Sequence, residues 1–270
     1  MEQQRNRKTG NTGQRQIALV TGASSGIGRE FVRQVAGRYP ELDEIWAVAR
    51  REERLEQLKK QHRSVRPVLA DLLEQEDCNR LAEQLKRENV SVRLLVNAAG
   101  CGFSGAFASQ SQETVAEMIR LNCQALTAVT GLILPYMPQR SRILQIASAS
   151  AFLPQPGFAV YAASKAYVRQ FSLALGQELK GRKITVTAVC PGPVNTEFFQ
   201  RAGQSVAGWK RVFLREAGPV VEKALRDAAR GRRESIYGLS MNAVRLGSRW
   251  LPWGLLLNIM GKWSERGVTE

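Results

Sequence analysis

Histidine is almost absent from this sequence of 270 residues, in which His62 is the only one. It lies in a charged stretch, and neither a metal centre nor a Ser-His-Asp triad is expected from it. Cysteine is also scarce, and the four residues Cys78, Cys101, Cys123 and Cys190 form no CxxC pair. Such widely spaced cysteines indicate reduced thiols in a cytosolic setting. We therefore predict no metal site and no disulfide framework.

Long hydrophobic runs are missing as well. The longest candidate, residues 250–260, contains Pro252, Gly254 and Asn258 and is shorter than the roughly 20 residues that span a bilayer. The N-terminal segment is polar and basic and lacks the apolar core of a secretory signal. We predict that residues 1–15 form a disordered basic tail. A cytoplasmic protein is expected, with peripheral contact to a membrane as the alternative.

Acidic residues are outnumbered, with 24 Asp and Glu against 39 Lys and Arg and a formal net charge of +15. Phosphate-bearing ligands, acidic proteins, anionic lipid and nucleic acid all respond to such a charge. The sequence has no zinc-finger spacing and no aromatic motif for stacking RNA bases, so nucleic acid is not an expected partner. A generally solvated basic surface explains the remaining charge.

Short apolar runs alternate with helical patterns along the chain. Strands are predicted over 17–20, 45–49, 65–70, 92–96, 142–147 and 184–190, and helices over 27–39, 52–61, 74–88, 112–137 and 158–180. After residue 196 we predict helices over 204–215 and 218–230, a short strand at 235–237 and an amphipathic extension over 242–263. Apolar strands between helices predict an α/β fold with a doubly wound, mostly parallel sheet covered on both faces. Residues 16–270 are expected to form one Rossmann-type domain.

A glycine-rich turn follows the first predicted strand and opens the first predicted helix. Residues 21–28 read Thr-Gly-Ala-Ser-Ser-Gly-Ile-Gly. Glycines at this place allow the backbone to approach a pyrophosphate, and the helix start offers N–H donors. The candidate cofactor-binding residues of the turn are Gly22, Ser24, Ser25, Gly26, Ile27 and Gly28.

The second predicted strand ends in Arg50 and Arg51 rather than in a carboxylate. A carboxylate there would bind the 2′-hydroxyl of the adenosine ribose, whereas guanidinium groups suit a 2′-phosphate. The pattern favours NADP(H) over NAD(H), unless both arginines merely begin a solvated helix. Asp71, at the end of the third strand, either accepts a hydrogen bond from the adenine or caps the following helix.

Tyr161 and Lys165 are four residues apart in a predicted helix, so their side chains share a face. A cation beside a phenol favours the phenolate and lowers the pKa of the hydroxyl group. Ser148 stands thirteen residues upstream of Tyr161. Together with a dinucleotide, these residues indicate redox chemistry at a carbonyl or an alcohol.

These motifs resemble the short-chain dehydrogenase/reductase family over about residues 16–196, with a looser fit to the end. The residues that carry the resemblance are the turn 21–28, Asp71, Asn97-Ala98-Ala99-Gly100, Asn122, Ser148, Tyr161-Ala162-Ala163-Ser164-Lys165 and Pro191-Gly192. The family has a second asparagine where Ala98 stands here. Since this segment mainly presents backbone to the adenosine side, we expect the change to be tolerated.

The resemblance implies a role for each site residue. Tyr161 would be the general acid in reduction and Ser148 would bind the reacting carbonyl oxygen. Lys165 would bind the nicotinamide ribose and lower the Tyr161 pKa, and Asn122 would hold a water that links Lys165 to solvent. The further cofactor contacts implied are Leu72, Asn97, Ala98, Gly100, Pro191, Gly192, Val194 and Thr196, of which the last four line the nicotinamide.

An apolar, aromatic set is available for the substrate pocket. It comprises Phe103, Phe107, Phe152, Leu153, Pro154, Phe158, Phe198, Phe199, Trp209 and Phe213, and a substrate lid is expected over about 196–215. The set predicts NADPH-dependent reduction of a hydrophobic ketone, aldehyde or 3-oxoacyl compound. The alternative for any one of these residues is a core or subunit contact.

The extension 242–263 combines tryptophan and leucine with basic residues. It resembles the C-terminal extension of family members that reduce lipid-like carbonyls. An oligomer contact or pocket lid, a membrane-surface helix and a docking site for an acyl carrier are the three interpretations. We expect a homo-oligomer, either a dimer or a tetramer.

Two other functions remain open. One is the reverse oxidation of a steroid- or lipid-type alcohol, and the other is a dinucleotide-binding sensor or scaffold without turnover. Family members without activity often lack the tyrosine or the lysine, whereas Tyr161 and Lys165 are both present here. The sequence therefore favours an enzyme.

Overall fold

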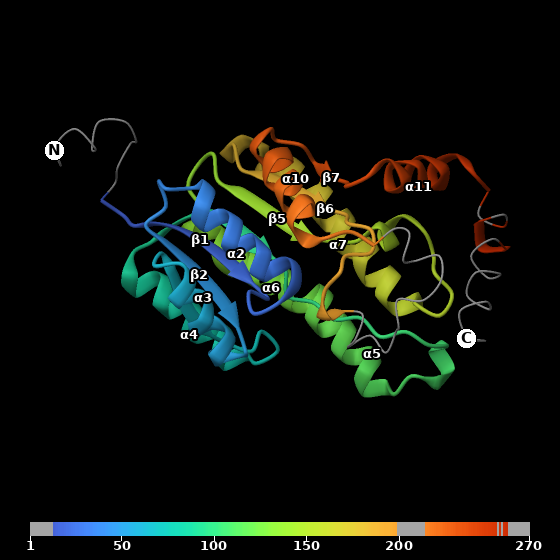
Figure 1. Cartoon of the computed structure of the whole chain (residues 1–270), viewed down its shortest axis with the longest axis horizontal. Coiled ribbons are helices and arrows are strands. Elements are labelled where there is room, and N and C mark those ends of the chain that lie inside the picture. Colours follow the sequence, from blue (N-terminus) through green and yellow to red (C-terminus); the bar gives the residue numbers. More distant parts are fainter. Residues whose placement is uncertain (1–12, 199–213, 253, 255, 259–270) are drawn as a thin grey trace.

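The computed structural model describes residues 13–198, 214–252, 254 and 256–258. Its centre is a seven-stranded parallel sheet with the strand order β3-β2-β1-β4-β5-β6-β7 (Figure 1). The strands are β1 (Gln16–Thr21), β2 (Glu44–Ala49), β3 (Val65–Leu69), β4 (Ser91–Asn97), β5 (Arg142–Ile146), β6 (Thr185–Val189) and β7 (Glu234–Ser235). This order confirms the expected doubly wound sheet.

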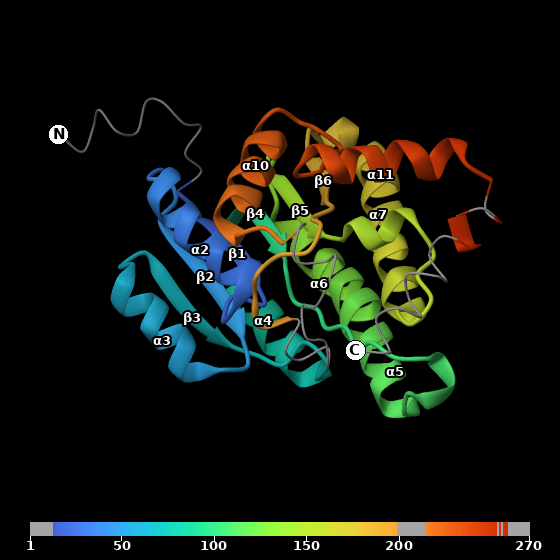
Figure 2. The same ribbon diagram turned by 45° about the vertical axis from the view of Figure 1, so that its right-hand side comes forward.

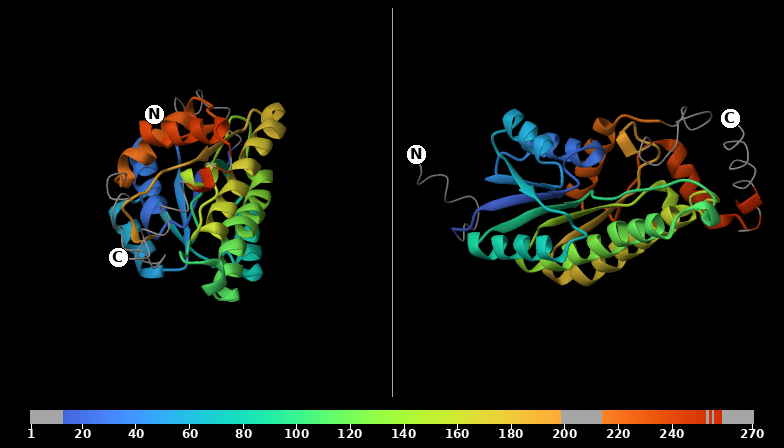
Figure 3. Two further views of the ribbon diagram at one scale, coloured as in Figure 1. Left: turned by 90° about the vertical axis from the view of Figure 1, so that its right-hand side faces the viewer. Right: turned by 90° about the horizontal axis from the view of Figure 1, so that it is seen from below.

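Helices cover both faces of the sheet, as the end-on view in Figure 3 shows. One layer holds α2 (Gly26–Arg38), α3 (Glu52–Gln61) and α10 (Ala217–Ala229). The other holds α4 (Gln75–Glu88), α6 (Leu126–Ile133) and α7 (Ala159–Glu178). Also named among the described residues are the helices α5 (Gln112–Ile119) and α11 (Leu239–Trp250), with short turns η1 (Phe107–Ser109), η2 (Arg120–Ala125), η3 (Leu134–Tyr136), η4 (Ala149–Phe152) and η5 (Leu179–Arg182).

The central strands are mostly apolar because both of their faces are buried. In β1, Ala18 and Val20 pack into the layer of α2, whereas Ile17 and Leu19 pack into the layer of α4. In β2 the residues alternate in the same way, and Trp46 is fully buried. Successive side chains of a strand point to opposite faces, so a continuous apolar run serves two cores at once.

The predicted helix over 112–137 is one helical run with changes of pitch. It contains α5, the wider π turn of η2, α6 and the tighter 3-10 turn of η3. Hydrophobic periodicity does not report such changes of pitch, so the sequence did not predict them.

Of the helices and the strand predicted after residue 196, one helix and the strand lie close to their predicted positions. The helix over 218–230 is α10, which begins one residue earlier, and the strand at 235–237 is β7, two residues long and shifted to 234–235. Most of the helix predicted over 204–215 lies outside the described residues.

The amphipathic extension begins earlier than predicted, because α11 starts at Leu239. Helix α11 lies to the right of the sheet in Figure 1 and along the upper right of the molecule in Figure 2, and it contacts η4. Leu239 and Trp250 are exposed to 91% and 81%. Among the helices of the described residues, none is both long and apolar enough to cross a bilayer.

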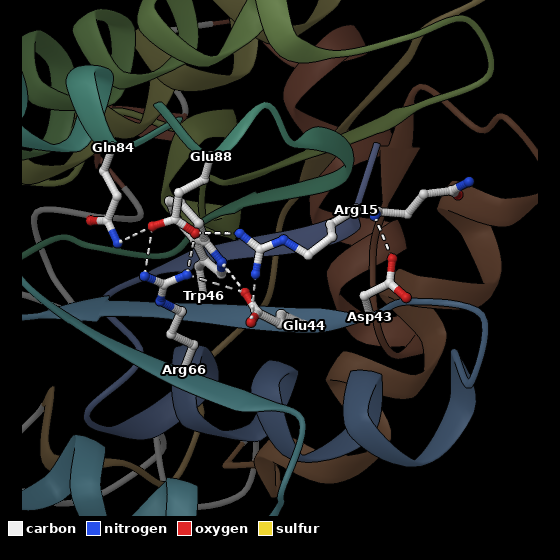
Figure 4. Close-up of polar contacts among 8 residues, drawn as sticks. Arg15, Asp43, Glu44, Trp46, Arg66, Gln84 and Glu88 are labelled. Atoms are coloured by element: carbon white, nitrogen blue, oxygen red, sulfur yellow. Dashed lines mark hydrogen bonds and ion pairs between the residues drawn. The ribbon is translucent and has the colours of Figure 1, made fainter. Parts of the chain in front are cut away.

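An ion-pair network ties the amino ends of the first strands together (Figure 4). Arg15 pairs with Glu44 at 3.0 Å and with Glu88, and Arg66 donates to both Glu88 oxygens at 2.5 and 2.7 Å. The hydrogen bond from Arg66 is the largest cause that holds the pKa of Glu88 at about 2. Arg15, the last residue of the predicted tail, is thus held by two carboxylates, whereas residues 1–12 lie outside the described residues.

Candidate active site

The candidate site lies at the carboxyl ends of the strands, where the strand order changes direction between β1 and β4. Loops from neighbouring parallel strands leave the sheet in different directions at this point and open a crevice, the usual ligand position in such sheets. The glycine turn follows β1, the segment 97–100 follows β4, Ser148 follows β5 and Pro191 follows β6.

The glycine turn is locked against the segment that follows β4. The hydroxyl oxygen of Thr21 accepts hydrogen bonds from the backbone N–H groups of Ala98 and Ala99 at 3.1 and 3.2 Å. Gly22 has φ +63°, and a Cβ there would lie 2.7 Å from the Ala99 nitrogen. A Cβ at Gly28 would lie 2.3 Å from the Gly22 oxygen. Only glycine fits at these two positions.

Helix α2 opens directly from this turn. Its N-cap residue Ser25 makes no side-chain capping hydrogen bond, and the first turn contains no acidic residue. The first N–H groups of an α-helix have no partner within the helix, and the helix dipole favours an anion there. Thr196 lies 3.3 Å from the position that a Gly26 Cβ would take, so the segment after β6 borders the same place. These groups fit the pyrophosphate of a dinucleotide.

Two arginines lie at the end of β2 beside the turn. Arg51 donates from Nε and Nη2 to the Ser24 hydroxyl at 3.1 and 3.0 Å. Arg50 pairs with Asp71 at 3.3 Å, and the other Asp71 oxygen accepts the Leu73 N–H at 3.0 Å. Asp71 therefore stabilises its own turn and does not cap α4, whose N-cap is Glu74, so the capping prediction is wrong.

The Asn97 side chain points away from the crevice. Its amide donates to the Thr130 hydroxyl and to the Gln145 side chain, both at 3.0 Å, in the interior. It connects β4 to β5 and α6. Its backbone is what a cofactor could contact, and the predicted contacts of Asn97, Ala98, Gly100 and Leu72 with the cofactor stay predictions.

Tyr161 and Ser148 meet in the interior of the site. Tyr161 is 8% exposed, and its ring lies 4.7 Å from Phe158 and 5.3 Å from Phe198, centroid to centroid. Burial raises the pKa of the Tyr161 hydroxyl to about 12, and a hydrogen bond with Ser148 offsets part of this rise. The phenol is therefore protonated at neutral pH and able to donate a proton.

Lys165 does not lower the pKa of Tyr161 in this structure, so the predicted direction is wrong here. The Lys165 ammonium donates to the carbonyl oxygen of Ile146 at 2.8 Å and lies 5.8 Å from the centre of the Tyr161 ring. Burial lowers the pKa of Lys165 itself to about 8. Desolvation outweighs the attraction between cation and phenolate because the ammonium faces the backbone rather than the phenol oxygen.

Asn122 is fully buried in the π turn between α5 and α6. Its carbonyl oxygen accepts the Cys101 N–H at 2.9 Å, and its amide donates to the Cys101 carbonyl at 2.8 Å and to the Ser164 hydroxyl at 3.0 Å. A Cβ on Gly100 would lie 2.9 Å from the Asn122 oxygen and 3.4 Å from Lys165 Nζ. The structure thus brings Asn122 and Lys165 to the same glycine.

The segment after β6 is held on two sides. The Pro191 carbonyl accepts the Ala149 N–H at 2.8 Å, and a Cβ on Gly192 would lie 2.8 Å from the sulfur of Met241 in α11. Val194 forms a parallel bridge with Arg215. Met241 could not be predicted as a neighbour of the site, since a methionine in an amphipathic helix carries no signal for it.

The proposed substrate-pocket residues divide into different environments. Phe158 and Phe198 adjoin Tyr161, and a Cβ on Gly102 would lie 2.5 Å from the Phe198 ring. Phe152 is a core residue, which is the alternative stated for each member of the set, and Phe107 is 65% exposed. Phe199, Trp209 and Phe213 lie outside the described residues.

Known proteins that are similar in sequence to this chain include dehydrogenases and reductases. The sequence profile of a family described as short chain dehydrogenase matches residues 16–207. A very-long-chain 3-oxoacyl-CoA reductase from Emericella nidulans is 35% identical over 183 residues, which are 64% of this chain and 52% of that protein. The chain spans about half the length of several curated relatives that it matches.

Solved structures agree with the fold. A short-chain dehydrogenase from Sphingobium yanoikuyae in complex with NADPH is 31% identical, with a TM-score of 0.74 over 86% of this chain and 94% of that one. A short chain dehydrogenase/reductase from Burkholderia phymatum in complex with NAD has a TM-score of 0.76 over 87% of this chain and 94% of that one. At 22% identity the second likeness shows the fold alone.

Proposed function

The chain belongs to the short-chain dehydrogenase/reductase family of oxidoreductases, and from this premise we propose that it uses NADPH to reduce a hydrophobic carbonyl compound to an alcohol. One observation carries the proposal: the buried, protonated Tyr161 hydroxyl is hydrogen-bonded to Ser148 and flanked by apolar rings at the crevice. A carbonyl that enters between these rings would find two hydroxyl donors for its oxygen.

The residues of the chain have distinct roles in the proposed reaction. Bound NADPH supplies the hydride. Ser148 donates a hydrogen bond to the carbonyl oxygen and stabilises its growing negative charge. Tyr161 then gives its proton to that oxygen, and its raised pKa keeps the proton in place at neutral pH. The reverse oxidation would start from the phenolate, which the same burial disfavours at neutral pH.

Lys165 and Asn122 act behind Tyr161 in this proposal. The Lys165 ammonium holds the nicotinamide ribose hydroxyls, and Asn122 positions the water that returns a proton from solvent. Both side chains border the space beside Gly100 that a Cβ there would enter, which supports this pairing of roles. A sensor without turnover would not need a buried ammonium, whose desolvation is unfavourable.

The preference for NADPH rests on the residues around the end of β2. Arg51 lies beside Ser24 of the glycine turn and Arg50 lies beside Asp71, and the sequence has no carboxylate at the end of the strand itself. Guanidinium and hydroxyl donors suit a 2′-phosphate. Known neighbours of the same fold bind NADPH in one case and NAD in another, so the preference is a proposal about this chain.

A ketone, aldehyde or 3-oxoacyl compound with an apolar chain is the substrate class we propose. The rings of Phe158 and Phe198 beside Tyr161 support it, as does the name of the Emericella nidulans relative. Met241 of α11 touches Gly192, which supports the pocket-lid interpretation of the extension. The cytoplasmic location and the homo-oligomeric state stay predictions.

The test follows NADPH absorbance with a homologous series of methyl ketones and a series of 3-oxoacyl thioesters, each repeated with NADH. Each buried methylene contributes about 0.8 kcal/mol, so kcat/KM should climb roughly fourfold per methylene before a plateau. A variant that ends after residue 238 should flatten the climb if α11 covers the pocket. A flat series, or a polyol as best substrate, would refute the apolar pocket.

A further inference from the structure

Three consecutive residues after β6 connect the two ends of the site. Thr196 lies against Gly26 of the glycine turn. Glu197 pairs with Arg51 at 3.0 Å and also accepts a hydrogen bond from Arg54. The Phe198 ring lies 5.3 Å from the Tyr161 ring, centroid to centroid. The segment 196–198 therefore contacts the adenosine end and the reacting end at once.

The Glu197 carboxylate is the anion that pairs with Arg51 in this structure. Arg51 uses Nε and Nη2 for Ser24 and Nη1 for Glu197, so one guanidinium joins the glycine turn to the segment after β6. The hydrogen bonds from Arg54 and Arg51 hold the pKa of Glu197 at about 2, so it is ionised at neutral pH. The Arg51 and Glu197 side chains are 29% and 34% exposed, which leaves them within reach of a ligand.

A 2′-phosphate bound at Arg51 would meet this carboxylate. Two anions at one guanidinium repel each other, and a phosphate carries more charge and more acceptor oxygens than a carboxylate. NAD(H) has no such phosphate and would leave the pair intact. Because Glu197 and Phe198 are adjacent, a backbone shift that releases Glu197 would carry Phe198 with it.

We infer that Glu197 is an internal counter-ion that the 2′-phosphate of NADP(H) replaces at Arg51, and that its release moves Phe198 relative to Tyr161. The inference rests on the proposed function, in which Arg51 takes that phosphate. It makes Glu197 a specificity-determining residue, since the carboxylate lowers the affinity for NADP(H) and leaves that for NAD(H) unchanged. Binding of the 2′-phosphate would therefore change the position of the Phe198 ring beside Tyr161.

The first experiment measures binding of 2′,5′-ADP and 5′-AMP by titration calorimetry, because these fragments differ only in the 2′-phosphate. The proteins are the wild type, Glu197→Gln and Glu53→Gln; Glu53 is exposed in the first turn of α3, the helix that carries Arg54. Glu197→Gln should bind 2′,5′-ADP about three- to tenfold more tightly, and 5′-AMP as the wild type does. Glu53→Gln makes the same change of net charge and should leave both affinities within about twofold.

Each result has one meaning. In one result, the wild type binds 2′,5′-ADP more tightly than 5′-AMP, while Glu197→Gln binds 2′,5′-ADP no more tightly than the wild type does. In that case the counter-ion inference is wrong and the NADPH preference stands. If the wild type binds the two fragments equally, the NADPH preference fails and the inference falls with it. If Glu53→Gln also binds 2′,5′-ADP more tightly than the wild type, the change in overall charge explains the gain in affinity. That result would overturn the inference.

The second experiment follows Phe198 by ¹⁹F NMR, with 4-fluorophenylalanine incorporated at position 198. Neither fragment carries a nicotinamide, so a change at this ring must pass through the chain. The inference requires that 2′,5′-ADP moves the resonance and 5′-AMP does not. In Glu197→Gln, the resonance without ligand should already lie toward the position of the 2′,5′-ADP complex. An unmoved resonance at saturating 2′,5′-ADP would overturn the coupling.

Discussion

The Lys165 ammonium donates to the Ile146 carbonyl at 2.8 Å, which ties a buried charge to the last residue of β5. Burial lowers the pKa of Lys165 from 10.5 to about 8. The folded protein therefore binds this proton less tightly than the unfolded chain does. The unfavourable contribution is complete below about pH 8 and disappears as the pH rises toward 10.5.

Lys165→Met should therefore raise the free energy of unfolding at pH 7, by about 1–2 kcal/mol after the lost hydrogen bond to Ile146 is subtracted. The gain should shrink between pH 8 and about 10, where wild-type Lys165 becomes neutral in the folded state. Urea unfolding of both proteins without added cofactor, at pH 7, 8, 9 and 10, checks this. A gain that does not change with pH would mean that packing, not charge, is responsible.

Tyr161→Phe should keep the fold and the affinity for NADPH but reduce kcat about 10²- to 10⁴-fold, since it removes the proton donor and keeps the ring. Single-turnover kinetics with the best carbonyl substrate gives the rate, and cofactor titration gives the affinity. Tyr167→Phe, on the same helix and 43% exposed, is the matched control. Near-wild-type turnover in Tyr161→Phe would remove this hydroxyl from the mechanism.

Arg51→Ala should weaken NADPH binding about 10- to 150-fold and leave NADH binding nearly unchanged, because a charge-assisted contact to phosphate contributes about 1.5–3 kcal/mol. Arg50→Ala should have a smaller effect, since Arg50 is 55% exposed and pairs with Asp71. Fluorescence titration of both cofactors measures this. Arg63→Ala, an exposed site after α3, controls for net charge. Equal losses for NADPH and NADH would contradict the phosphate contact.

Gly28→Ala should abolish NADPH binding and lower the free energy of unfolding, because the added Cβ would lie 2.3 Å from the Gly22 oxygen. The matched change on the same helix is Gly37→Ala, where nothing lies within 4 Å of the new Cβ. Gly37→Ala should raise the free energy of unfolding by up to about 1 kcal/mol, because alanine has the higher helix propensity. Thermal unfolding and cofactor titration of both variants distinguish a steric effect from a general effect of glycine.

The fold could be predicted from the sequence because its determinants are local. Ile17 to Val20 is apolar on both faces, as a buried parallel strand must be, and Gly22 and Gly28 mark a turn that no other residue can make. The grouping of Ser148 with Tyr161 was likewise predictable, since both lie in the connection that leaves the carboxyl end of β5.

Side-chain direction could not be predicted in this way. Whether Lys165 faces the phenol or the Ile146 carbonyl depends on torsion angles and competing acceptors, and Asn97 turns inward because Thr130 and Gln145 offer it partners. Glu197 was overlooked because its partners, Arg51 and Arg54, are more than 140 residues away in the chain.

The π turn at η2 shows how this site could arise or vanish in evolution by a single codon. A π turn equals one residue inserted into a regular helix, so the segments on either side keep their faces toward the core. Deleting one residue there, such as Cys123, would restore a regular helix and leave Met118 and Val129 buried. It would take away the widened backbone from which Asn122 reaches Cys101 and Ser164. In an alignment, a one-residue gap at this place would separate chains with this arrangement from chains of the same fold that lack it.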